Sequence, residues 1–229
     1  MTIDELRSGR VFLIDKPLDW TSFDVVNKLR WHIKREFDVK AIKVGHAGTL
    51  DPKATGLLIV CTGKATREIA AFQNLYKAYT GTLKLGASTP SSDTETAENE
   101  WLPTLAITED SISEAAMGFQ GEREQLPPAY SAIRQNGKRL YELARSGKKP
   151  NEVSRKIHIY SFTIKQIAFP FVGFTVRCSK GTYIRALARD FGKALHNKGY
   201  LTELRRTETG PYALRNALSL AQTLDIIRR

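Results

Sequence analysis

The stretch that most constrains the fold is Gly45-His46-Ala47-Gly48-Thr49-Leu50-Asp51-Pro52-Lys53-Ala54-Thr55-Gly56. Its glycines and its proline interrupt regular structure, and the apolar run Leu57 to Cys61 follows directly. We therefore expect Asp51 to lie on a loop that leads into a buried strand. Because glycines allow sharp turns and close approach to the backbone, the carboxylate of Asp51 is a candidate reactive group. The alternative is that Asp51 only caps a turn before Pro52.

The segment before this loop predicts a strand, a loop and a helix. Residues Val11 to Ile14 are apolar and are closed by Asp15-Lys16-Pro17. Thr21 or Ser22 then suits the N-cap of a helix. The apolar positions of this helix recur at helical spacing and are Val25, Val26, Leu29 and Ile33.

The rest of the chain predicts more strands than strict strand-helix alternation would give. Expected strands are Tyr79–Leu85, Tyr130–Arg134, Ile157–Ile167 and Phe171–Cys178. Expected helices are Thr66–Asn74, Thr108–Met117, a short one ending at Gly147 after an Asn136-Gly137 turn, and one capped by Thr182. The polar, acidic stretch from Ala87 to Glu100 suggests a mobile loop. This pattern predicts an α+β fold with a mixed or largely antiparallel sheet flanked by helices.

Composition suggests a globular protein with a polyanionic partner. Hydrophobic residues make up 41% of the 229 residues, and charged residues 26%. Lys and Arg number 35 against 24 Asp and Glu, which gives a formal charge of +11. Such an excess favours nucleic acid as the partner, although a solvated basic surface is the plainer explanation.

The same composition gives no sign of a metal site, secretion or a membrane span. The two cysteines, Cys61 and Cys178, lie far apart and form no C-x-x-C pair, so we expect buried thiols in a reducing compartment. The four histidines add no familiar zinc spacing. No signal core and no stretch of 18 apolar residues is present, so we expect a cytoplasmic protein.

Several segments in fixed order resemble the motifs of the TruB family of pseudouridine synthases. The family's catalytic aspartate lies where Asp51 lies. The further matches cover residues from about 10 to 212 and are Lys16-Pro17 with Thr21-Ser22, Lys77-Ala78-Tyr79, Pro128-Ala129-Tyr130-Ser131-Ala132, Gly137 to Tyr141, Ser179 to Arg185, and Leu204-Arg205-Arg206. The resemblance implies the pseudouridine synthase catalytic fold and isomerisation of a uridine in the T-loop of tRNA, at position 55 of the TΨC sequence.

The resemblance also implies roles for individual residues. Asp51 would be the catalytic carboxylate, with Arg185 as its cationic partner and Tyr79 as the aromatic face for the base. Plainer roles are a phosphate contact for Arg185 and core packing for Tyr79. The other substrate-binding residues implied are His46, Tyr183, Leu204 and Lys16. Candidate phosphate contacts, each of which could equally be a solvated charge, are Lys64, Arg67, Lys138, Arg139, Arg145, Lys148, Lys149, Arg205 and Arg206.

The chain departs from the family pattern in two places. Asp19-Trp20 replaces the usual glycine-containing step after Lys16-Pro17, which affects the expected loop shape. The sequence ends at Arg229, so we expect one catalytic domain over residues 1–229, with at most a small extension at 213–229 and no C-terminal RNA-binding PUA domain. We therefore expect a monomer that acts on the T-stem-loop of tRNA without a guide RNA or an obligatory protein partner.

Two other functions compete with this one. A non-catalytic RNA-binding or RNA-folding module would share the basic and aromatic residues, but it gains nothing from placing a carboxylate such as Asp51 beside a polyanion. A pseudouridine synthase acting on another RNA is the second alternative. The chemistry itself needs only one carboxylate, as a nucleophile at C6 of the base or C1′ of the ribose, or as a base that starts elimination.

Because no step of this isomerisation requires a metal ion or an organic cofactor, we predict that activity survives exhaustive chelation. The measurement is pseudouridine formation before and after treatment with a chelator, on a stem-loop whose folding is independent of metal. A metal requirement that persists with this substrate would contradict the prediction.

Overall fold

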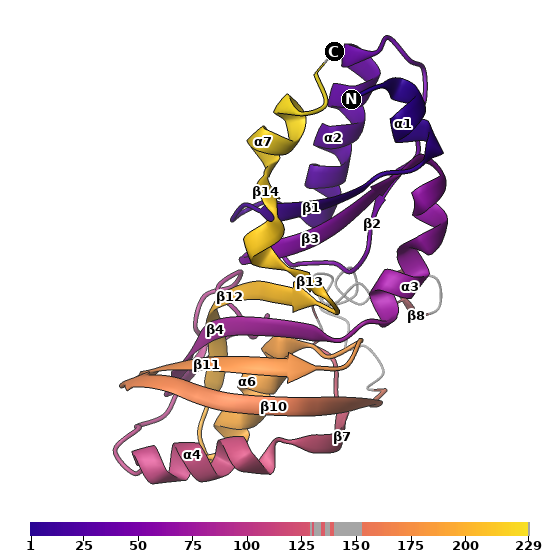
Figure 1. Ribbon diagram of the computed structural model, residues 1–229. Coiled ribbons are helices and arrows are strands. Elements are labelled where there is room, and N and C mark those ends of the chain that lie inside the picture. Colours follow the sequence, from indigo (N-terminus) through magenta and orange to yellow (C-terminus); the bar gives the residue numbers. More distant parts are fainter. Residues whose placement is uncertain (129, 131–133, 136–137, 140–152, 229) are drawn as a thin grey trace. The chain divides into compact units, whose positions relative to one another are not determined.

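The computed structural model describes residues 1–128, 130, 134–135, 138–139 and 153–228 (Figure 1). The chain forms two compact units: unit 1 contains Met1–Tyr79 and Arg205–Arg229, and unit 2 contains Thr80–Leu204. The chain passes from one unit to the other within strand β4 (Lys77–Leu85) and again within strand β12 (Gly199–Thr209).

Unit 1 is built around a short mixed sheet. Its strands follow the order β14-β1-β3-β12, with β2 paired to β3 and β13 paired to β12. β1 runs antiparallel to β3 and parallel to β14. The elements are α1 (Ile3–Ser8), β1 (Val11–Lys16), α2 (Ser22–Glu36), β2 (Val44–His46), β3 (Ala54–Thr62), the 3-10 helix η1 (Gly63–Glu68), α3 (Ile69–Asn74), β13 (Tyr212–Ala213), η2 (Leu214–Asn216), β14 (Leu218–Ser219) and α7 (Leu220–Asp225).

The core of unit 1 lies on both faces of β3. Leu58 and Val60 pack with the apolar face of α2, and Ile59 and Cys61 pack with Phe72 of α3 on the other face. A strand covered on both faces needs a continuous apolar sequence, which explains the run from Leu57 to Cys61. The helix face predicted from sequence is buried as expected, and Thr21 forms the N-cap of α2.

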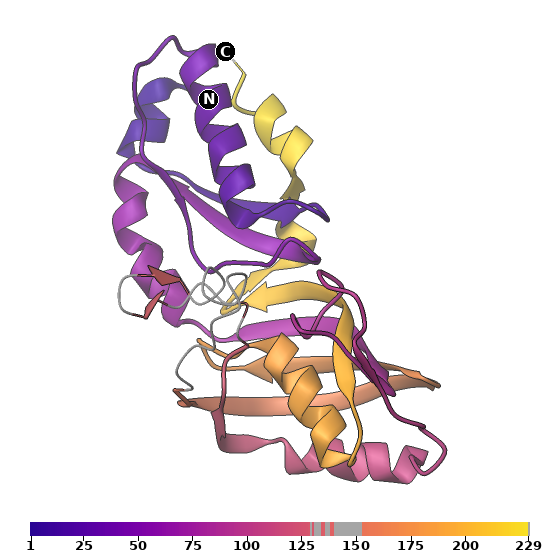
Figure 2. The same ribbon diagram turned by 180° about the vertical axis from the view of Figure 1, so that it is seen from behind.

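Unit 2 contains a set of paired strands with two helices against it. Within it the strand order is β12-β4-β11-β10-β7, and Figure 2 shows α6 across one face of these strands. β10 runs antiparallel to both β11 and β7. The elements are β5 (Ala87–Ser88), β6 (Glu100–Trp101), α4 (Glu109–Gly118), β7 (Gly121–Gln125), β8 (Arg134–Gln135), β9 (Lys138–Arg139), β10 (Arg155–Ala168), β11 (Phe171–Cys178) and α6 (Ile184–Ala194).

Aromatic rings form the centre of unit 2. Phe162 of β10 contacts Phe119, Phe174 and Phe191 edge to face, with ring centroids 5.4 to 6.0 Å apart. This geometry is favourable for aromatic pairs and adds to the free energy of burial. The rings join α4, β10, β11 and α6 into one core, so the helices are held to the strands by packing.

The predicted fold class is confirmed, since mixed strands flanked by helices make up the structure. The predicted strands at Tyr79–Leu85, Ile157–Ile167 and Phe171–Cys178 correspond to β4, β10 and β11. Both cysteines are buried thiols, and burial raises the pKa of Cys61 to about 11. Among the described residues, none of the helices combines the length and the apolar character that crossing a membrane requires.

Three sequence predictions need correction. Thr182 does not cap α6, because Tyr183 is the N-cap residue and the Thr182 hydroxyl donates to the Ser179 carbonyl. The predicted helix from Thr66 to Asn74 is a 3-10 helix up to Glu68 and an α-helix only from Ile69. The stretch from Ala87 to Glu100 is anchored, because β5 pairs with β6 and its polar residues Thr89, Ser91, Ser92 and Asp93 are buried.

Part of the predicted region around residue 136 lies outside the described residues. This applies to the Asn136-Gly137 turn, the short helix ending at Gly147 and most of the Tyr130–Arg134 strand. β8 and β9 pair antiparallel, Arg134 with Arg139 and Gln135 with Lys138.

Asp19 preserves the loop shape that a glycine would give. Its φ is 62°, in the left-handed region where glycine carries no steric cost. Its backbone N–H donates to the Pro52 carbonyl over 2.9 Å, and its carboxylate pairs with Lys53 at 2.7 Å. The departure from the family pattern therefore leaves the loop in a glycine-like conformation.

Within the stretch from Ala87 to Glu100, Glu98 makes the stability of the fold depend on pH. The carboxylate of Glu98 accepts hydrogen bonds from Lys84, Tyr200 and Trp101, which lower its pKa to about 2. Because the folded-state pKa is lowered, the stabilisation is complete above the ordinary value of 4.5 and is lost as pH falls toward about 2.

We therefore predict that Glu98→Gln reduces the free energy of unfolding near neutral pH, and that its difference from wild type shrinks below pH 4.5. Urea unfolding of both proteins across this range is the measurement. A difference that is constant with pH, or that grows in acid, would contradict the role of Glu98.

Candidate active site

Asp51 lies half-buried on the loop between β2 and β3, and the loop around it is hydrogen-bonded at several points. The buried hydroxyl of Ser22 accepts from the Leu50 N–H at 2.8 Å and donates to the Leu50 carbonyl at 3.1 Å. The Ala54 N–H donates to the Asp51 carbonyl at 3.1 Å. The backbone on both sides of Asp51 is thus fixed by groups of the same unit.

Lys16 is fully buried beside this loop. Its Nζ donates to the carbonyls of Pro17, Trp20 and Pro52 at 2.8, 2.6 and 3.4 Å. Burial lowers the pKa of Lys16 to about 8, and the nearby Asp51 carboxylate opposes this shift. Lys16 is therefore charged at neutral pH and ties the loop after β1 to the residue that follows Asp51.

Arg206 of β12 also binds the backbone of the Asp51 loop. Its side chain is buried, its Nε donates to the Leu57 carbonyl at 2.7 Å, and its Nη2 donates to the Gly48 carbonyl at 3.0 Å. Gly56 has a φ of 99°, and a Cβ there would lie 2.3 Å from the Arg206 carbonyl oxygen. A glycine is required at this position by both the backbone conformation and the close approach of β12.

His46 and Tyr79 complete the predicted residues of unit 1. His46 ends β2, and burial together with the positive charge of Arg206 lowers its pKa below 6.5, against a hydrogen bond with the Gly48 backbone. The imidazole is therefore neutral at neutral pH. Tyr79 lies in β4 and is 8% exposed.

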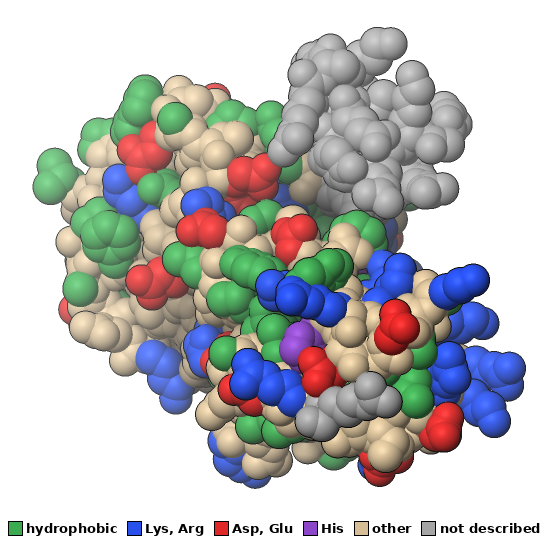
Figure 3. All heavy atoms as spheres, turned by 90° about the horizontal axis from the view of Figure 1, so that it is seen from above, with side chains coloured by type: hydrophobic (Ala, Val, Ile, Leu, Met, Phe, Trp, Pro, Cys, Tyr) green, Lys and Arg blue, Asp and Glu red, His purple; other side chains and the backbone are tan. Residues whose placement is uncertain are grey.

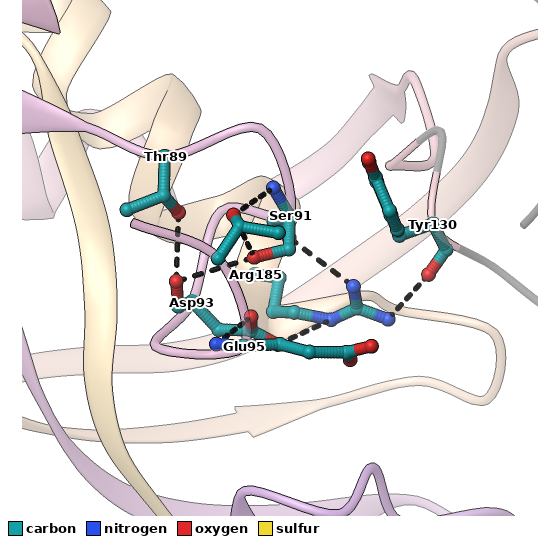
Figure 4. Close-up of polar contacts among 7 residues, drawn as sticks. Thr89, Ser91, Asp93, Glu95, Tyr130 and Arg185 are labelled. Carbon is teal, nitrogen blue, oxygen red and sulfur yellow. Dashed lines mark hydrogen bonds and ion pairs between the residues drawn. The ribbon is translucent and has the colours of Figure 1, made fainter. Parts of the chain in front are cut away.

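In unit 2, Arg185 is the centre of a buried polar network (Figure 4). Its Nη1 donates to the Ser91 carbonyl at 3.1 Å and its Nη2 to the Tyr130 carbonyl at 2.9 Å. The carboxylate of Asp93 lies 3.5 Å from its Nε, and both side chains are about 5% exposed or less. The network holds the guanidinium in one orientation, and the predicted pairing of Arg185 with Asp51 stays a prediction.

Tyr183 is positioned through its backbone. The buried side chain of Gln125 accepts from the Tyr183 N–H at 2.8 Å and donates to the Tyr183 carbonyl at 3.1 Å. The guanidinium of Arg155 lies 5.4 Å from the centre of the tyrosine ring. Leu204, the last residue of unit 2, is half-buried in β12.

The structure thus brings Lys16, His46 and Asp51 to adjoining segments of unit 1, and places Arg185 and Tyr183 at the start of α6 in unit 2. The sequence did not predict that Asp93 pairs with Arg185, nor that the side chain of Gln125 binds both backbone groups of Tyr183. Asp93 is one acid in an acidic stretch, and Gln125 carries no charge. Neither has a sequence signal that distinguishes it from its neighbours.

The candidate phosphate contacts divide into several groups. Lys64 and Arg67 are exposed, and Arg205 is half-buried, with its guanidinium 2.6 Å from Asp15. Arg206 is buried and its donors bind the carbonyls of Leu57 and Gly48, so it is not a solvated surface charge. Arg145, Lys148 and Lys149 lie outside the described residues, as do the side chains of Lys138 and Arg139. Figure 3 shows Lys and Arg side chains gathered on part of the molecular surface.

Comparison with known proteins decides the family. Residues 34–184 match the family model described as the TruB family pseudouridylate synthase, N-terminal domain. The chain belongs to the TruB family. It is similar to proteins named tRNA pseudouridine synthase B from Flavobacterium johnsoniae, at 51% identity over 96% of both chains, and from Chlorobaculum tepidum, at 50% identity over 96% of this chain and 92% of that one.

A solved relative shares the fold of the TruB chain. A Cbf5 chain in the crystal structure of a Cbf5-Nop10-Gar1 complex matches 98% of this chain with a TM-score of 0.72 and 30% identity. The match covers 56% of that Cbf5 chain. The family assignment identifies the protein as a pseudouridine synthase, an isomerase, as the sequence motifs predicted.

The two hydrogen bonds between Gln125 and the Tyr183 backbone can be tested by substitution. Gln125→Glu keeps the acceptor for the Tyr183 N–H but removes the donor to its carbonyl and buries a carboxylate. We expect a loss of roughly 1–3 kcal/mol in the free energy of unfolding and a lower rate of pseudouridine formation.

Denaturant unfolding and a turnover assay measure the two effects. The matched control is Gln120→Glu, five residues earlier on an exposed position, which should stay within about 0.5 kcal/mol of wild type. Equal behaviour of the two variants would show that Gln125 does not hold Tyr183.

Proposed function

We propose that this TruB enzyme converts the T-loop uridine of tRNA, at position 55, into pseudouridine, with Asp51 as the catalytic carboxylate. The observation that carries the proposal is the placement of Asp51: a half-buried carboxylate on a loop whose neighbouring backbone groups are bound by Ser22, Lys16 and Arg206. The tRNA substrate is supported by the name of relatives at 51% identity.

The reaction is an isomerisation. The bond from N1 of uracil to C1′ of the ribose breaks, the base turns, and C5 bonds to C1′ while the C5 proton is lost and N1 gains one. Asp51 serves as the nucleophile at C6 or C1′, or as the base that starts elimination. A carboxylate does this work only if it is held in reach of the reacting atom, which a fixed loop provides.

The target base must leave the folded RNA to reach Asp51. In the proposal Tyr79 supplies the stacking face, Tyr183 and Leu204 contact the extruded base, and neutral His46 lies in the RNA interface. Arg185 acts as the cation for Asp51, because a desolvated carboxylate stays ionised at neutral pH only with such compensation. The buried network of Asp93 and Ser91 supports this role by fixing the guanidinium.

The proposal extends to the setting in which the enzyme works. We infer that it acts in the cytoplasm as a monomer on the T-stem-loop, without guide RNA, protein partner, metal or cofactor. The excess of 35 basic over 24 acidic residues supports an RNA substrate, and it predicts binding that weakens as salt rises.

The test of function compares wild type with Asp51→Asn. This substitution keeps shape but removes the charge and the nucleophile, so we predict loss of turnover with tRNA binding retained within a few-fold. Pseudouridine is mapped at single-nucleotide resolution in an unmodified tRNA transcript, and binding is measured by filter retention or fluorescence.

The charge-matched control is Asp225→Asn, an exposed aspartate of α7, which should turn over at the wild-type rate. Asp51→Asn turnover near that rate would falsify the role of Asp51. Wild-type binding without any modification would indicate a non-catalytic RNA-binding module, and modification only of another RNA would contradict the proposed substrate.

A further inference from the structure

Arg205 and Arg206 are consecutive on β12 but have opposite environments. The Arg205 side chain is 42% exposed and contacts Asp15 and Thr55. Arg206 is 1% exposed and is among the largest fully buried side chains of the described residues. A guanidinium is always charged, and its burial is costly unless its donors are well used.

The two donors of Arg206 reach the two ends of the Asp51 loop. Nη2 binds the carbonyl of Gly48, three residues before Asp51, and Nε binds the carbonyl of Leu57, six residues after it. The backbone of Arg206 also touches Gly56, where no side chain would fit. Side chain and backbone of one residue therefore set both the start and the end of the loop.

We propose that Arg206 is a positioning residue that fixes the loop carrying Asp51 and does not contact RNA. This inference rests on the proposed function of Asp51. A planar fork is needed because the two carbonyls belong to different segments, and one compact ammonium cannot reproduce both bonds at their positions. The resulting precision matters, since a misplacement of about 1 Å can reduce a rate by roughly 100-fold.

The test uses Arg206→Lys, which keeps the positive charge but loses the planar guanidinium whose Nε and Nη2 bind the two carbonyls. We expect the single-turnover rate constant at saturating enzyme to fall by roughly 10- to 100-fold. The Kd for tRNA should stay within about threefold, and the slope of log Kd against log salt should be unchanged, because no phosphate contact is lost. The matched control is Arg215→Lys, the same exchange at an exposed residue of η2, expected at the wild-type rate.

A wild-type rate in Arg206→Lys would overturn the proposal. The slope of log Kd against log salt is also measured for Arg206→Gln, which removes the positive charge. A slope lowered by about 0.7–0.9 with an unchanged rate would assign Arg206 to a phosphate instead. Failure of the wild-type enzyme to modify tRNA would instead refute the proposed function, so the two failures are distinguishable.

If circular dichroism shows that the Arg206 variants do not fold, Gly48→Ala asks the same question. The added methyl group lies 3.5 Å from Nη1 of Arg206, at a φ of 102°. That distance is an ordinary contact, but the positive φ strains any side chain, so the backbone at Gly48, whose carbonyl Arg206 binds, must shift. We expect a slower single-turnover step with an unchanged salt slope, because the loop moves and no charge is lost. A wild-type rate in this variant would overturn the proposal.

Discussion

An irregular loop leaves backbone carbonyls without ladder partners, and when the loop is partly buried these carbonyls must be bound by other groups. Around the Asp51 loop, the buried cations Lys16 and Arg206 do this. Lys16 donates to Pro52 and to the loop after β1, and Arg206 donates to Gly48 and Leu57. Both carry a cost of burial that their hydrogen bonds to carbonyls offset, and together they fix the backbone that presents Asp51.

Unit 2 uses neutral and charged side chains in the same way. Gln125 binds both backbone groups of Tyr183, and the guanidinium of Arg185 binds the carbonyls of Ser91 and Tyr130. Tyr183, a proposed contact with the substrate, is thus held by a second residue that binds its main chain. Such supporting residues keep a reactive geometry without touching the substrate, which is the arrangement that preorganised sites require.

The sequence predicted the elements whose apolar pattern is strong. α2 follows from helical periodicity, β3 from its continuous apolar run, β10 and β11 from their strand-like patterns, and the Asp51 loop from its glycines and proline. The sequence could not show that Arg205 is half-exposed while Arg206 is buried, because alternation along β12 depends on which strands it pairs with. Nor could it show that the acidic stretch after β4 folds inward at Asp93, since its burial depends on Arg185, 92 residues later.

If these contacts hold the Asp51 loop, the loop is already built in the free enzyme. Amide hydrogen exchange of wild type without RNA tests this at Ala47, Leu50 and Ala54, whose N–H groups donate to Ile59, Ser22 and Asp51. We expect these three amides to exchange as slowly as those in the interior of β3. Exchange near the rate of an unstructured chain, becoming slow only when tRNA is added, would show that RNA assembles the loop and that Lys16, Arg206 and Ser22 do not hold it in the free enzyme.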